Sequence, residues 1–200
     1  AHLLTAGVGG VATTNNPDLT VKMRSLANHG RDGIYLSIDD DDGLSKSLMK
    51  EVVQRRFCFE SVGHSYRVTE LEAALALGQL GDWQSMIQRR RENADYLTRS
   101  LSDLKKVYLP RKRPNTEQAH MMYPIVAETD KWELCNHLEE RGVETREMLR
   151  LTDQPVYEGL WNPKDYPVAE WVNQYGFYIG CHQTLTRQDL NQIVMAVYDY

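Results

Sequence analysis

The sequence predicts a mixed α/β chain in which part of a larger α/β unit is followed by a small α+β domain. Capped helices with apolar stripes alternate with short β-branched segments along the 200 residues. One long helical pattern covers residues 83–104. After it, residues 105–200 predict strand, helix, strand, strand and helix, the order of an α+β or split βαβ module. We therefore divide the chain into residues 1–82, 83–104 and 105–200.

The first part opens on a glycine-rich stretch and a capped helix. Small and β-branched residues over 3–14 predict two short strands around a tight turn. Asn16 followed by Pro17 is typical of a helix N-terminus, because asparagine caps free N–H groups and proline fits the first helical position. Gly30 is expected to end this helix.

The remainder of the first part alternates short elements with loops. A short strand over 34–38 and an acidic loop over 39–43 precede a weak helical pattern over 45–54. Thr69 and Glu72 have the spacing of a capping box, so a further helix is expected to begin there.

The long helix is expected to begin after the break at Gly81-Asp82. Its apolar stripe over 83–104 has a spacing close to a heptad, and Arg90 alone interrupts it. Two prolines and three basic residues over 109–115 predict a connecting loop behind this helix.

The last domain shows strand and helix signals in regular succession. Apolar and β-branched runs predict its strands, and capping residues mark where its helices begin. The strands are expected at 121–127, 143–148 and 176–180, and the helices after Asp130, near Trp171 and after Thr186-x-x-Asp189.

Composition narrows the function classes. The net charge of −5, from 28 acidic and 23 basic residues, argues against a nucleic-acid-binding surface. No apolar run approaches the ~20 residues of a membrane-spanning helix. Cys58, Cys135 and Cys181 stand far apart, which favours a reducing compartment and hence the cytoplasm over a disulfide framework.

Several local features are ambiguous by themselves. The glycine-rich residues 5–10 fit either close backbone approach to a ligand or a tight hairpin. The acidic run 39–42 fits a solvated loop better than a cation site, because it lacks the ligand spacing of a calcium loop. The basic run 89–91 fits a solvated helix face better than a phosphate or partner contact. None of the six histidines pairs with another at metal-ligand spacing, so no metal site is expected.

Three motifs carry a resemblance when they are taken together. The first has the pattern Lys, two or three residues, Thr, Gly-x-Gly-Gly, then Thr-Asn, a helix and His-Gly-Arg; here it matches residues 2–10, 14–15 and 28–31. The second has the pattern Gly-x-Asn-x-Arg-x-Thr-Glu, then Ala-Ala and Gln-Leu. The third has the pattern Gly-Val-x-Thr-Arg followed by Gln-Pro-x-Tyr. The second matches residues 63–70, 73–74 and 79–80, and the third matches 142–146 and 154–157.

In order and spacing these motifs resemble the DegT/DnrJ/StrS family of pyridoxal-phosphate-dependent sugar aminotransferases. The resemblance covers the C-terminal half of a typical member. It implies that residues 1–82 are the tail of a fold-type I cofactor-binding domain and that 105–200 are the small C-terminal domain. It further implies pyridoxal or pyridoxamine 5'-phosphate as cofactor, a nucleotide-linked keto sugar as substrate, and a homodimer with shared active sites. We expect the chain to be a fragment that lacks the segments stacking on the cofactor ring.

The chain departs from the family pattern at the position of its catalytic lysine. His2 stands where the family has the lysine that forms the Schiff base, and an imidazole cannot form that bond. Relatives with histidine at this place resemble 3-dehydratases of nucleotide-linked 4-keto-6-deoxy sugars, in which the histidine acts as the base. An unperturbed imidazole pKa of ~6.5 suits that role.

The resemblance also suggests the remaining site residues. Ser65 stands where the family has an asparagine that reaches the cofactor phosphate of the neighbouring subunit, and His64 is the alternative donor. His2, His64 and Ser65 are therefore the expected cofactor-binding residues, with His2 catalytic. Arg67, Arg146 and His182 are the expected substrate-binding residues, although a structural salt bridge would explain either arginine equally well. The alternative function is a truncated or catalytically inactive homologue with a binding or regulatory role.

Overall fold

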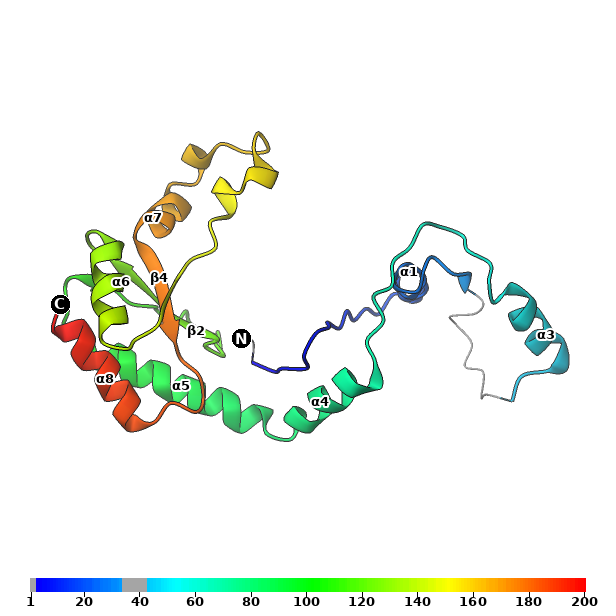
Figure 1. Cartoon of the computed structure of the whole chain (residues 1–200), viewed down its shortest axis with the longest axis horizontal. Helices are drawn as coiled ribbons and strands as arrows, with labels where there is room; N and C mark the ends of the chain where they lie inside the picture. The colour runs from blue at the N-terminus through cyan, green and yellow to red at the C-terminus, as the bar shows by residue number, and fades with distance from the viewer. Residues whose placement is uncertain (1–2, 34–42) are drawn as a thin grey trace. The chain divides into compact units, whose positions relative to one another are not determined.

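A computed structural model describes residues 3–33 and 43–200 (Figure 1). The chain divides into two compact units, Thr5–Leu80 and a second made mainly of Gly81–Tyr200. The mixed α/β class predicted from the sequence is confirmed. His2, the strand predicted over 34–38 and the acidic run 39–42 lie outside the described residues.

The second unit is built on a four-stranded antiparallel sheet. Its strands are β1 (Val107–Tyr108), β2 (Met122–Ala127), β3 (Thr145–Glu147) and β4 (Gly176–Gly180), arranged in the order β1-β2-β4-β3. Three of these strands were predicted. β1 was not, because a segment of only two residues leaves no periodic pattern to recognise.

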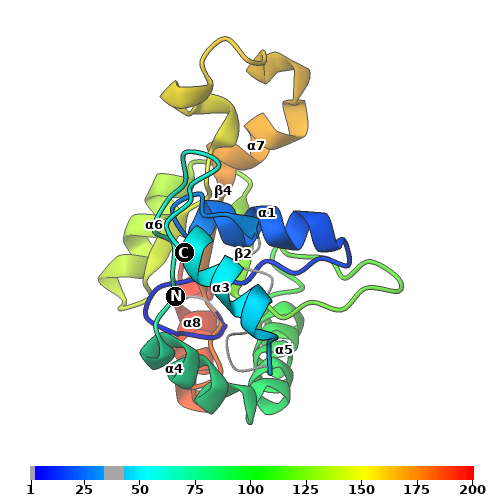
Figure 2. The ribbon, with the colours of Figure 1, turned by 90° about the vertical axis from the view of Figure 1, so that its right-hand side faces the viewer.

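Three helices cover the buried face of this sheet, namely α5 (Trp83–Ser100), α6 (Lys131–Glu140) and α8 (Arg187–Tyr198). α5 and α8 run side by side, and α6 contacts α8 and the sheet (Figures 1 and 2). The apolar side chains that these elements bury together are Leu97, Leu101, Tyr123, Ile125, Leu134, Leu138, Phe177, Ile179, Leu190, Ile193 and Val197. This core fixes the ends of β2 and β4 against α5, which matters for the site below.

Local signals explain where these helices begin and end. The Asp130 carboxylate accepts a hydrogen bond from the Trp132 N–H at 2.8 Å and caps α6, and Gly142 follows its end with φ 76°. Thr186 and Asp189 form the predicted capping box at the start of α8. A fourth helix, α7 (Pro167–Tyr175), begins with proline at the position that favours it.

The unit Thr5–Leu80 contains three described helices, α1 (Pro17–Ala27), α3 (Lys46–Arg55) and α4 (Glu70–Leu80). The Asn16 side chain accepts hydrogen bonds from two N–H groups of α1, and Ser45 caps α3. Few of its described residues are buried; they are Ser25, Gly30, Asp32 and Val52. Polar and backbone contacts therefore hold this unit together more than an apolar core does.

The two strands predicted over residues 3–14 are wrong, because this described stretch is irregular. Its glycines Gly7 and Gly9 adopt φ angles of 81° and 135°, which extended strands do not use. The N–H of Thr5 donates to the Gln79 side chain at 3.0 Å instead of to a neighbouring strand. A segment with a strand-like sequence pattern forms a strand only when the backbone of another segment pairs with it.

Candidate functional site

The second half of the first motif and the start of the second motif lie against each other in the unit Thr5–Leu80. The His29 N–H donates to the His64 carbonyl at 2.8 Å, and the His64 N–H donates to the Leu26 carbonyl at 2.7 Å. The Tyr66 N–H donates to the Ala27 carbonyl at 3.0 Å. Two segments more than thirty positions apart in sequence are thus fixed side by side through their backbones.

Glycines make this close approach feasible. Gly30 has φ 80°, and a Cβ atom placed on it would lie 1.9 Å from the Ser61 carbonyl oxygen. A Cβ atom on Gly63 would lie 2.1 Å from the Gly30 nitrogen. Neither position accepts a larger residue without separating the two segments. The glycines of both motifs therefore have a physical role in joining them.

A buried carboxylate adds a second tie to the same region. Asp32 is 2% exposed, and its Oδ2 accepts from Arg55 Nε at 2.7 Å. The Asp32 N–H donates to the Cys58 carbonyl at 2.9 Å. Arg31 places its guanidinium 5.5 Å from the centre of the Phe57 ring. These contacts anchor α3 and the segment behind it to the end of the first motif.

The start of the first motif is held beside α4. Thr5 exchanges hydrogen bonds with the Gln79 side-chain amide through both its N–H and its carbonyl. A Cβ atom on Gly9 would lie 3.2 Å from Val68 Cγ2, so the glycine-rich stretch passes close to the beginning of α4. Gln79 belongs to the second motif, and through these hydrogen bonds it holds the start of the first motif in place.

Three of the predicted site residues, His64, Ser65 and Arg67, are exposed and lie on one short segment before α4. The His64 ring stacks on the Tyr66 ring with centroids 4.8 Å apart. Together they offer an imidazole, a hydroxyl and a guanidinium, which are donor groups suited to phosphate oxygens. This donor set fits the phosphate of a pyridoxal cofactor, although none of the three groups could hold it covalently in place of a lysine.

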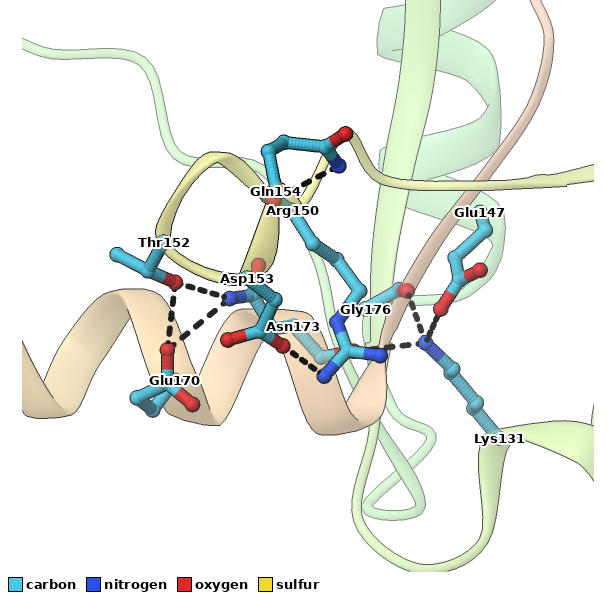
Figure 3. Close-up of polar contacts among 9 residues, drawn as sticks. All are labelled: Lys131, Glu147, Arg150, Thr152, Asp153, Gln154, Glu170, Asn173 and Gly176. Carbon is cyan, nitrogen blue, oxygen red and sulfur yellow. Dashed lines mark hydrogen bonds and ion pairs between the residues drawn. The ribbon is translucent and has the colours of Figure 1, made fainter. Parts of the chain in front are cut away.

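The third motif lies in the unit Gly81–Tyr200, where buried Lys131 organises its surroundings (Figure 3). Lys131 is 3% exposed, and its Nζ donates to Glu147 Oε1 at 2.9 Å and to the Asn173 carbonyl at 2.7 Å. A longer contact of 3.5 Å reaches the Gly176 carbonyl. Because these carbonyls belong to the end of α7, the ammonium group caps that helix and ties it to β3.

A second polar network fixes the segment that contains Gln154. Asn173 Nδ2 donates to Thr152 Oγ1 at 3.0 Å, and that hydroxyl donates to Glu170 Oε1 at 2.7 Å. Gln154 Nε2 donates to the Arg150 carbonyl at 3.0 Å (Figure 3). The turn that carries the second half of the third motif is thus fastened to α7.

Replacing Lys131 by methionine is expected to destabilise this unit by about 1–3 kcal/mol, because the carbonyls of α7 and the Glu147 carboxylate lose their donor. Lys164→Met is the matched control, since Lys164 is exposed. Urea unfolding followed by tryptophan fluorescence measures both variants. Equal midpoints for the two would contradict the capping role of Lys131.

Within the described residues, no hydrogen bond or ion pair joins Arg146 to His182. Arg146 lies on β3 opposite Tyr178 of β4, whereas His182 follows the end of β4 four residues after Tyr178. Arg146 thus lies within the β3–β4 ladder, and His182 lies beyond the end of β4. Arg146 is exposed and bonds to Glu144 at 2.7 Å, which raises the pKa of its guanidinium. His182 Nδ1 lies 2.7 Å from Thr184 Oγ1.

The prediction of a solvated helix face for residues 89–91 is wrong for Arg90. Arg90 is 4% exposed, and burial lowers the pKa of its guanidinium. Its Nε donates to Gln183 Oε1 at 2.9 Å, and its Nη1 donates to the carbonyls of His120 and Met121, each at 3.2 Å. The signal for this burial was present in the sequence, because Arg90 falls on the apolar stripe of its helix.

Residues 3–33 and 43–200 contain neither a metal site nor a membrane-spanning helix. No group of three His, Cys, Asp or Glu side chains there is arranged to hold a metal ion. None of the helices in this part of the chain has both the length and the apolar character to cross a bilayer.

Comparison with known proteins gives one consistent family. The sequence model of the DegT/DnrJ/EryC1/StrS aminotransferase family matches residues 1–198. The chain is 26% identical over 217 residues to a dTDP-4-dehydro-2,6-dideoxy-D-glucose 3-dehydratase of Saccharopolyspora spinosa, with 100% of this chain and 46% of that protein covered. It is 26% identical to a GDP-perosamine synthase of Caulobacter vibrioides, with 98% and 48% covered.

Solved structures show the same fold. DesV of S. venezuelae, determined in complex with a ketimine intermediate, aligns with a TM-score of 0.75 at 23% identity over 93% of this chain and 45% of that one. A GDP-4-keto-6-deoxymannose-3-dehydratase aligns with a TM-score of 0.73 at 16% identity over 92% and 49%. The expected fold, part of a fold-type I architecture, is confirmed. The chain spans about half the length of these relatives.

Proposed function

The chain belongs to the DegT/DnrJ/EryC1/StrS aminotransferase family, and from this premise we propose that the full-length protein removes the C3 hydroxyl of a nucleotide-linked 4-keto-6-deoxy sugar. The observation that carries the proposal is His2, which stands where the first motif has the catalytic lysine. Amino transfer by the usual route requires that lysine as covalent anchor and proton shuttle. An imidazole retains only the proton-transfer function.

His2 would act as the general base and then as the general acid. The neutral imidazole accepts one proton, and the resulting imidazolium gives a proton to the departing C3 hydroxyl, which leaves as water. When bound, pyridoxamine phosphate would supply the amino group that joins the sugar carbonyl and the two electrons that replace the C3 hydroxyl. The nitrogen left on the sugar would be released as ammonia when water restores the carbonyl. Glutamate would return the amine and the two electrons to the cofactor and leave as 2-oxoglutarate.

The remaining site residues would bind and orient rather than react. His64 and Ser65 offer donors for the cofactor phosphate, and their exposure supports a contact with a neighbouring subunit in a homodimer. Arg67, Arg146 and His182 would contact the phosphates or hydroxyls of the nucleotide-linked sugar. The names of two relatives support the substrate class, since the S. spinosa protein and the GDP-4-keto-6-deoxymannose protein are both 3-dehydratases.

Amino transfer is the second candidate, because the family bears that activity in its name. Borohydride reduction separates the two. The full-length protein is incubated with pyridoxal phosphate, reduced and digested, and its peptides are analysed by mass. We expect bound cofactor that is never fixed to the protein. A single modified active-site lysine would favour amino transfer, and failure to bind cofactor would favour a catalytically inactive homologue.

A further inference from the structure

Two histidines follow the same end of the β2–β4 ladder. The last pair of this ladder is Met122 with Gly180. His120 precedes Met122 by two residues and His182 follows Gly180 by two, so they occupy matching positions beyond the sheet. His120 is half-buried and has φ 49°, a left-handed conformation that costs free energy in a residue other than glycine. Such a conformation is retained where the surroundings impose it, often at a functional site.

Two polar side chains of α5 impose this arrangement. Arg90 donates to the His120 and Met121 carbonyls on one segment and to the Gln183 side chain on the other. Asn93 is 1% exposed, and its Nδ2 donates to the His182 carbonyl at 2.8 Å. All of these acceptors are neutral oxygens, and within the described ranges Arg90 has no carboxylate partner. A buried guanidinium thus joins the two histidine-bearing segments and keeps its positive charge unneutralised.

Both cations and carboxylates lie near the two histidines. Burial is the main cause that lowers the pKa of the His120 imidazole. The nearby Asp95 carboxylate raises this pKa, and the more weakly acting Arg91 and Lys112 lower it. Arg91 is paired with Glu117 at 2.8 Å, whereas no ion pair forms at Lys112 within the part of the chain that the structure describes. Near His182 lies the carboxylate of Asp189, whose oxygen accepts from the Thr186 N–H and hydroxyl.

We propose that His120 and His182 bind the diphosphate of the nucleotide-linked substrate, with Arg90 as the positioning residue that holds their segments together. The choice of substrate rests on the proposed function. A diphosphate fits because it is anionic and takes only donors, and this site offers two imidazoles beside Arg90, whose described partners are all neutral oxygens. The Nδ1 of His182 is engaged with Thr184, which orients its ring and leaves Nε2 to meet the ligand.

The test is an NMR pH titration of the chain with isotope-labelled histidine, without and with inorganic pyrophosphate. We expect the pKa values of His120 and His182 to rise with pyrophosphate, because a nearby anion stabilises the imidazolium form. The internal control is His137, whose Nε2 lies 3.0 Å from the Ala196 carbonyl and whose ring contacts Tyr200; its pKa should stay unchanged. A rise shared equally by His137 would indicate non-specific anion binding and overturn the proposal, as would no rise at all.

Two variants separate recognition from folding. His120→Asn removes the imidazole but keeps a residue that tolerates the left-handed backbone, and we expect it to weaken pyrophosphate binding about tenfold. Arg90→Lys keeps the charge but cannot reach both segments, and the same loss is expected with the circular dichroism spectrum unchanged. Wild-type affinity in both variants would contradict the proposal.

The source of the phosphate is tested by changing the ligand. dTDP and GDP should shift the two histidines as pyrophosphate does, whereas pyridoxal phosphate should not. Shifts with pyridoxal phosphate alone would assign the site to the cofactor and overturn the proposal. These readouts do not depend on turnover. Loss of the histidine shifts in a protein that still removes the C3 hydroxyl would therefore count against this site and not against the proposed function.

Discussion

Replacing His2 with asparagine is expected to abolish removal of the C3 hydroxyl and to leave the fold intact. Asparagine is close to histidine in size and has hydrogen-bonding groups, but it cannot take up and release a proton near neutral pH. Because general acid–base catalysis contributes about 10²–10⁴-fold, turnover should fall at least about a hundredfold. The rate is measured with the full-length protein, a nucleotide-linked 4-keto-6-deoxy sugar and glutamate. Circular dichroism checks the fold.

His2→Lys is the matched variant. Lysine restores the amine that can bind the cofactor covalently, so borohydride should fix the cofactor at this position while dehydration is lost. Undiminished turnover in His2→Asn would contradict the role of His2 as base. An absence of any fixed adduct in His2→Lys would instead show that the first motif has been placed wrongly on the active site.

Gly30→Ala is expected to have the largest effect on the unit Thr5–Leu80. Its φ of 80° is unfavourable for alanine by about 1–2 kcal/mol. The added Cβ would also lie 1.9 Å from the Ser61 carbonyl oxygen, and relieving such overpacking typically costs a further 1–3 kcal/mol. We therefore expect a loss of about 3 kcal/mol in the free energy of unfolding, measured by urea denaturation with circular dichroism.

Gly10→Ala is the control for this substitution. No atom lies within 4 Å of a Cβ placed on Gly10, and its φ is not in the left-handed region. Alanine there should be neutral or slightly stabilising, since it restricts the unfolded chain. If Gly30→Ala and Gly10→Ala unfold at the same urea concentration, the junction between the first and second motifs does not hold this unit together.

Local signals in the sequence were sufficient for most helices. The capping box of Thr186 and Asp189 and the Asn16-Pro17 start each involve neighbours in sequence, so their outcome depends little on the rest of the chain. The strands expected over 3–14 are not formed, because a strand needs a second segment to pair with and no local pattern indicates one. The backbone of Thr5 is bound by Gln79 instead.

The candidate site shows the same contrast between local signals and contacts of distant segments. The motifs place His64, Ser65 and Arg67 together because they are neighbours in sequence. No pattern indicated that Gly63 would pack against Gly30 or that Arg90 would join His120 to the turn after β4, since both are contacts between distant segments. The roles of the predicted site residues in binding and catalysis stay predictions, and His2 lies outside the described residues.

The most direct test of the central claim is the identity of the reaction product. The full-length protein is supplied with a nucleotide-linked 4-keto-6-deoxy sugar, pyridoxal phosphate and glutamate, and the sugar product is analysed by mass spectrometry. Our account predicts a product that has lost the C3 oxygen, has kept its carbonyl group and contains no new nitrogen. A product that keeps the C3 hydroxyl and carries an amino group in place of the carbonyl would contradict it.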